Sequence, residues 1–102
     1  RRMSTGILPA AIAGKRCLYA TMTRASAFEA MKVIKDHSDM QNLGGQINQS
    51  TQVLTFPSGG FIKFATIIDK DDERKLAGME FDLANDYALE WPGVAARVRP
   101  ST

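Results

Sequence analysis

Two carboxylates near the end of the sequence, Asp86 and Glu90, are of the residue type that phosphoryl-transfer chemistry uses. In enzymes that hydrolyse nucleotides, an aspartate after a run of apolar residues holds magnesium, and a nearby carboxylate orients the attacking water. In the segment FDLANDYALE, Asp86 lies within one position of that aspartate, but Asn85 interrupts the apolar run and Tyr87 replaces the adjacent glutamate. Asp86 is therefore the candidate metal ligand, and Glu90 is the nearest carboxylate that could orient the water.

A phosphate-binding loop of the form G-x-x-x-x-G-K-[ST] would have to accompany such carboxylates. Its glycines let backbone N–H groups approach the phosphates, its lysine neutralises them and its hydroxyl binds magnesium. The pair Gly14-Lys15 does not complete this pattern, because Pro9 stands at the first glycine position and Arg16 replaces the hydroxyl. Since both parts of the chemistry are incomplete, we expect the chain alone to hydrolyse ATP poorly or not at all.

Length and composition limit the class of protein. A chain of 102 residues has room for one domain, and 44% hydrophobic with 24% charged residues is typical of a globular domain rather than a disordered one. The net charge of +2 is too small to indicate a nucleic-acid-binding protein by electrostatics alone. The longest apolar stretch, residues 6–14, is shorter than the about 20 residues of a membrane span. We therefore expect a soluble, cytoplasmic protein with no membrane contact.

The elements that must position these residues follow from apolar spacing. Residues 17–22 form a nearly continuous apolar run, as in a strand buried on both faces, and the lone Cys17 within it reads as a core residue. Residues 26–36 have apolar positions at helical spacing after a capping box of Ser26 and Glu29. Residues 52–56 and 61–67 flank a Pro-Ser-Gly-Gly turn and predict a β-hairpin. The expected buried residues are Leu18, Phe28, Met31, Leu54 and Phe64.

The remaining segments complete an α/β order. A short helix is expected before Gly14, with Ser4 or Thr5 as its cap. Residues 39–50 read as a loop, residues 71–77 as a short helix that stops at Gly78, and residues 81–89 as a weaker strand. This order predicts a small sheet with a β-hairpin insertion and flanking helices, in a single α/β domain or a fragment of a larger one.

Several motifs, in this order, make the chain similar to the ATPase motor domain of viral DNA-packaging terminases. Residues 13–25 resemble the second core strand of that family with its Thr-Arg element, residues 56–64 resemble its F-P-N-G-S-x-I-x-F hairpin, and residues 71–82 resemble its short charged helix before an F-D strand entry. The resemblance implies part of a P-loop NTPase core that couples ATP hydrolysis to translocation of double-stranded DNA. It also implies ATP and magnesium as ligands, packaging subunits or the portal as partners, and the host cytoplasm as location.

The resemblance also implies roles for individual residues. The segment Arg1-Arg-Met-Ser-Thr5 is similar to the family's R-R-x-G-K-[ST] motif without its glycine and lysine. The implied roles are nucleotide binding for Arg2, Ser4 and Thr5, magnesium binding for Thr5 and Asp86, catalysis for Asp86 and Glu90, and DNA contact for Thr23 and Arg24. The alternatives are a small non-catalytic module that binds protein or DNA, and an unrelated small protein whose matches are accidental.

Overall fold

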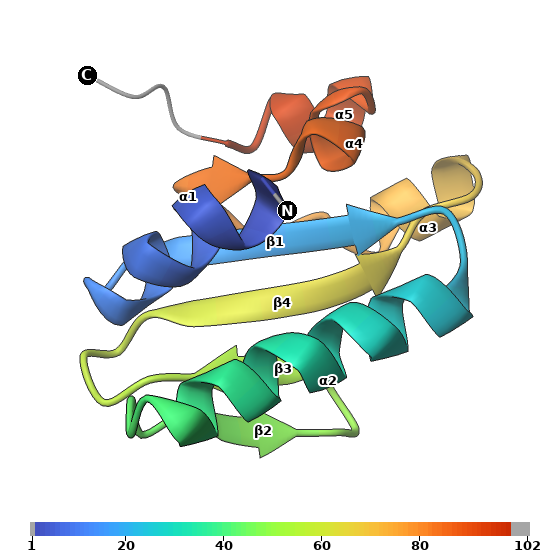
Figure 1. Cartoon of the computed structure of the whole chain (residues 1–102). Coiled ribbons are helices and arrows are strands. Elements are labelled where there is room, and N and C mark those ends of the chain that lie inside the picture. The colour runs from blue at the N-terminus through green and yellow to red at the C-terminus, as the bar shows by residue number, and fades with distance from the viewer. Residues whose placement is uncertain (1, 99–102) are drawn as a thin grey trace.

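A mixed β-sheet runs through the centre of the molecule, which the computed structural model describes over residues 2–98, with the backbone alone for residues 2–5 (Figure 1). The strands are β1 (Arg16–Thr21), β2 (Gln46–Asn48), β3 (Val53–Thr55), β4 (Phe61–Thr66) and β5 (Leu83–Ala84). They lie in the order β2-β3-β4-β1-β5. The central strand β1 is parallel to both β4 and β5, whereas β2 and β3 are antiparallel additions beside β4. The predicted α/β class with an inserted hairpin is confirmed.

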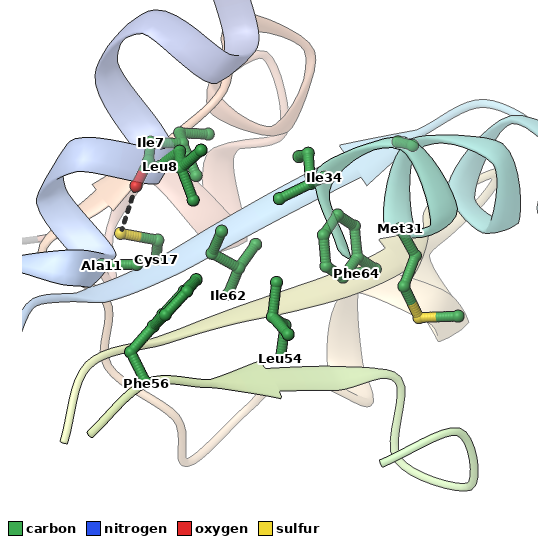
Figure 2. Packing of buried hydrophobic residues seen from close by; sticks show 11 residues of the cluster. Ile7, Leu8, Ala11, Cys17, Met31, Ile34, Leu54, Phe56, Ile62 and Phe64 are labelled. Carbon is green, nitrogen blue, oxygen red and sulfur yellow. Dashed lines mark hydrogen bonds between the residues drawn. The ribbon is translucent and has the colours of Figure 1, made fainter. Parts of the chain in front are cut away.

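The helices divide between the two faces of the sheet. They are α1 (Arg2–Ile12), α2 (Arg24–Met40), α3 (Lys70–Arg74), α4 (Asp86–Leu89) and α5 (Pro92–Ala95). The long helices α1 and α2 lie in front of the sheet and share one core cluster with Cys17, Ile62 and Phe64 (Figures 1 and 2). Leu18 and Ala65 point the opposite way, because side chains alternate along a strand, and they pack with residues of α4 and α5. No helix among residues 2–98 is long and apolar enough to span a bilayer.

Strand β1 is buried as its apolar run predicts. Leu18 and Cys17 are fully buried, and the Cys17 thiol donates a hydrogen bond to the carbonyl oxygen of Ile7 at 3.6 Å (Figure 2). Burial raises the pKa of Cys17 to about 11, so the thiol stays protonated at neutral pH. Cys17 is thus a core residue that joins β1 to α1.

Helix α2 begins earlier than the sequence indicated. Its cap is Thr23, whose hydroxyl accepts a hydrogen bond from the backbone N–H of Ser26 at 3.1 Å, so the predicted capping box at Ser26 and Glu29 is wrong. The buried stripe follows Ala27, Ala30, Met31, Ile34 and Ser38. Phe28 lies about 100° around the helix from Ala27, outside that stripe, and is 43% exposed. Its predicted burial is wrong, whereas Leu18, Met31, Leu54 and Phe64 are buried as expected.

The hairpin of β3 and β4 forms where it was predicted, with Thr55 opposite Phe61. A third strand, β2, lies within residues 39–50, which were expected to be a loop. Its short sequence, Gln-Ile-Asn, has one apolar residue, Ile47, which packs against the front core. A strand of three residues with polar neighbours carries too little apolar pattern to distinguish it from a loop.

Helix α1 runs back along β1, so its amino end lies toward the carboxyl ends of the parallel strands (Figure 1). It ends as predicted before Gly14, which has a positive φ of 102°. The helix begins at Arg2, so the backbone of Ser4 and Thr5 is already helical and the prediction that either residue caps it is wrong. Pro9 lies inside the helix, where it supplies no N–H.

Of the strand predicted over residues 81–89, only Leu83 and Ala84 form one, and the prediction is wrong from Asn85 onward. Strand β5 has two residues, and α4 follows after Asn85. The Asn85 side chain accepts a hydrogen bond from the Ala20 N–H at 2.9 Å and donates one to the Ala20 carbonyl at 2.8 Å. The Asn85 side chain thus makes the hydrogen bonds to β1 that the backbone of a longer β5 would make. The backbone pairing of β5 ends here, and the chain continues as a helix. Asp86 is therefore the first residue of α4, and Glu90 follows its last turn.

Candidate functional site

The carboxyl ends of β1 and β4 meet at the point where the chain changes faces of the sheet. The two strands are adjacent and parallel. Strand β1 leads into α2 in front of the sheet, whereas β4 leads through α3 to residues that pack behind it. Open α/β sheets bind ligands in the crevice outside such a switch point. This edge is therefore the candidate site.

A cavity of about 310 Å³ lies at this edge, beside the second half of β4. Its polar lining comes from the start of α2, the turn before β3, β4 and the region of α3. These polar residues are Arg24, Gln52, Lys63, Thr66, Asp72 and Lys75. Three of the six are cationic and one is anionic, so the cavity suits an anionic ligand.

Lys63 lies deepest among the three cations. It alternates along β4 with Ile62 and Phe64, which are buried in the front core, and its side chain therefore points to the other face. The ammonium group donates a hydrogen bond to the Thr51 carbonyl oxygen at 2.6 Å. Burial lowers the pKa of Lys63. Its remaining N–H groups can serve a ligand.

Lys75 and Asp72 form an ion pair on the rim, with 3.6 Å between the ammonium nitrogen and the carboxylate oxygen. The Asp72 carboxylate also accepts a hydrogen bond from the Ile68 N–H at 2.9 Å. That backbone hydrogen bond, with the charge of Lys75, lowers the pKa of Asp72. Asp72 thus fixes the loop after β4 and offsets Lys75. Of the three cations that line the cavity, Arg24 and Lys63 form no ion pair with a described carboxylate.

The predicted DNA-contacting residues Thr23 and Arg24 both lie at this edge, but in different situations. The Thr23 hydroxyl caps α2 and donates a hydrogen bond to the Ser26 hydroxyl at 2.8 Å, so it is already engaged. Arg24 is exposed and lines the cavity. It has no ion pair within residues 2–98. Thr23 is a positioning residue for α2, whereas Arg24 is available to a ligand.

The predicted catalytic carboxylates lie apart from the cavity lining. Asp86 and Glu90 are exposed, Asp86 as the first residue of α4 and Glu90 as the residue that follows the helix. Neither side chain forms a hydrogen bond or ion pair with the described residues. Within the same part of the chain, no group of three His, Cys, Asp or Glu side chains is arranged to hold a metal ion.

The residues implied for ATP and magnesium lie at the starts of two helices, with Arg2, Ser4 and Thr5 in α1 and Asp86 in α4. The backbone of Arg2, Ser4 and Thr5 is helical, and their side chains lie outside the described atoms. Tyr87, at the position of the catalytic glutamate, donates its hydroxyl hydrogen bond to the Ile67 carbonyl at 2.6 Å. The departures at Asn85 and Tyr87 hold the edge of the sheet together, so no hydrolytic step follows from them.

The amino end of β1 carries a second group of cations, far from the cavity. Arg16 binds Asp82 through its side chain, with hydrogen bonds of 3.2 Å from Nε and from Nη2, and its backbone N–H adds a third at 2.9 Å. The side-chain hydrogen bonds from Arg16 lower the pKa of Asp82 to about 2. The six residues of β1 separate this end from Arg24 by roughly 20 Å at about 3.3 Å per residue. Arg16 is thus committed to structure.

Sequence reasoning did not identify Lys63, Lys75 or Gln52 as site residues. A signal for Lys63 was present, because it is the one charged residue inside the apolar strand 61–67. Gln52 and Lys75 reach the cavity only through the turn before β3 and the path of α3, which no local pattern predicts.

Comparisons with known proteins identified no relative of this chain. The sequence matches no family model, and neither a curated protein nor a solved structure is significantly similar to the chain. The resemblance to terminases therefore rests on the sequence motifs alone.

Proposed function

We propose that this chain is a DNA-binding α/β unit of the terminase type that contacts phosphates through Arg24 and does not hydrolyse ATP unaided. The observation that carries the proposal is the position of Arg24. It is an exposed arginine without an acidic partner in the described chain, at the first turn of a long helix and at the switch point of the sheet. Backbone N–H groups at such a helix end favour anions as well.

The charges predict a weak interaction. Lys75 lies on the rim with its side chain 77% exposed, but Asp72 partly offsets it. Arg16 is paired with Asp82 at the other end of β1. Few phosphate contacts mean a shallow salt dependence, so we expect duplex DNA to bind non-specifically, more weakly than about 10 μM, through about two or three phosphates.

The motif resemblance supplies the wider setting of the proposal. In a packaging motor of that type, the edge with Arg24 would face double-stranded DNA. ATP and magnesium would drive translocation, and other packaging subunits or the portal would be partners. This chain would then contribute DNA contact, and the carboxylates Asp86 and Glu90 would not suffice for turnover.

The DNA-binding half of the proposal is tested by fluorescence anisotropy with a labelled duplex over a range of salt concentrations. Arg24→Ala should reduce the slope of log affinity against log salt by about one. Lys15→Ala, at the opposite end of β1, is the matched control and should leave the slope unchanged. If Lys15→Ala reduced the slope and Arg24→Ala did not, DNA would bind at the amino end of β1, and the proposal would be rejected.

The second half is tested by steady-state phosphate release with ATP and magnesium. We expect no turnover above background, because no described residue completes a phosphate loop or an Asp-Glu pair. Turnover of about one per second that is abolished by Asp86→Ala would show that the degenerate motifs are sufficient.

A further inference from the structure

The cavity runs along a part of β4 that has no neighbouring strand. Strand β3 pairs with β4 only as far as Lys63, and one more hydrogen bond, from the Phe64 N–H to the Gln52 carbonyl at 2.9 Å, ends the ladder. The Ile67 N–H points the other way, to the Thr21 carbonyl of β1. Because N–H directions alternate along a strand, the N–H and C=O of Thr66 point toward the cavity. No backbone group of the described chain pairs with Thr66 on that side.

These groups match the edge of an unpaired base. Thr66 offers one backbone donor and one acceptor, and the Gln52 side chain lines the same cavity. The Watson–Crick edge of a base carries donors and acceptors at similar spacing, but it is free only in a single strand. The side chain of Ile68 also lines the cavity and is 64% exposed, so it offers an apolar surface to the face of a base.

The cations of the cavity suit the phosphate of the same nucleotide. Lys63 and Arg24 both line the cavity, and no carboxylate of the described chain pairs with either. Asp72 is engaged by Lys75 and the Ile68 N–H, so it does not cancel both cations. A volume of about 310 Å³ is at the lower end for small-ligand sites, enough for one nucleotide. A base that is still paired and stacked cannot enter it.

We infer that this cavity binds one unpaired nucleotide of a DNA strand, with the phosphate at Arg24 and Lys63 and the base against Thr66, Gln52 and Ile68. This inference rests on the proposed function and adds a preference to it. Duplex DNA meets only the exposed rim at Arg24, whereas a single strand or a frayed end also reaches Lys63 and Ile68. The protein should therefore bind single-stranded DNA more tightly than duplex DNA.

The test is anisotropy with a 3′-labelled ten-nucleotide oligothymidylate, alone and annealed to its complement, at one salt concentration. We expect the single strand to bind at least about fivefold more tightly. Lys63→Gln and Ile68→Ser should each lower the ratio of single-strand to duplex affinity toward one. Ile68 is exposed, so its variant should fold even if Lys63→Gln does not. Lys32→Ala, an exposed cation of α2 outside the cavity, is the control and should change neither.

The outcomes separate the inference from the proposed function. Duplex binding through Arg24 with no preference for the single strand would overturn the inference and leave the function. Absence of binding to either DNA would reject both. Thymidine 5′-monophosphate should compete only at millimolar concentration. Competition by the free nucleotide at the affinity of the strand would assign the cavity to a small ligand and overturn the assignment to DNA.

Discussion

The arginines near the two ends of β1 differ in whether a carboxylate pairs with them. At the amino end, Arg16 forms three hydrogen bonds with Asp82, which join the first residue of β1 to the residue before β5. At the carboxyl end, Arg24 is exposed without an acidic partner in the described chain, and the Lys63 ammonium group donates a hydrogen bond to the Thr51 carbonyl oxygen. A charge that is paired across 66 residues of sequence serves the fold, whereas an exposed charge without an acidic partner is free to bind an anionic ligand.

The largest expected effect tests the core on which both ends depend. Phe64 is fully buried and its ring meets that of Tyr19 edge to face, with 5.9 Å between centroids. Phe64→Ala should lower the free energy of unfolding by about 3 to 5 kcal/mol in urea titrations followed by circular dichroism. Phe28→Ala is the matched control, because Phe28 is exposed, and it should cost less than about 1 kcal/mol. Equal losses would show that the front core is misassigned.

The fold was predictable where the apolar pattern was long. The run of residues 17–22 and the hairpin around the Pro-Ser-Gly-Gly turn gave β1, β3 and β4, since both signals are local. The strand order was not predictable, because β5 has two residues and is held by the side chain of Asn85 rather than by propensity. The cap of α2 was misplaced because Thr23 and Ser26 are both good caps, and only the path of the chain after β1 decides between them.

The site was predictable only in part. Arg24 lies at a strand end in a basic region, and the sequence placed it correctly at the carboxyl edge of the sheet. Gln52 and Lys75 lie 28 and 51 residues after Arg24 in the sequence. Their meeting with Arg24 depends on the switch of faces between α2 and α3, which is a property of the topology and not of a motif.

A second prediction asks how the carboxyl end keeps its shape. Asn85 makes two hydrogen bonds with the backbone of Ala20, and Asn85→Ala would leave that N–H and C=O without partners. We expect a loss of about 1 to 3 kcal/mol in the free energy of unfolding. Asn85→Asp can still accept from the Ala20 N–H but sets a carboxylate oxygen against the Ala20 carbonyl oxygen, so its loss should be at least as large. If both variants match the parent, the ladder at this end does not depend on Asn85.

The third prediction uses pH to sharpen the contrast between the two ends. The pKa of Asp82 is about 2 in the folded protein, below its ordinary value of 3.8. A depressed carboxyl pKa contributes stability that is present above the unfolded value and is lost as pH falls through the folded one. The parent should therefore lose stability between about pH 4 and pH 2, and Asp82→Asn should lose less over that interval when both are compared by urea titration. Parallel pH profiles would mean that this ion pair contributes nothing.

The smallest expected effect is a matched pair of arginine variants, one at each end of β1. Arg16→Ala removes side-chain hydrogen bonds to Asp82, and since the pair is partly exposed we expect only a small loss in the free energy of unfolding. Arg24→Ala should change that free energy by less than about 0.5 kcal/mol, because no described carboxylate loses a partner. The same Arg24→Ala should weaken binding to duplex DNA, whereas Arg16→Ala should not. An arginine whose removal reduces DNA binding but not stability has a role in ligand binding. If Arg24→Ala instead reduced stability but not binding, Arg24 would have a structural role.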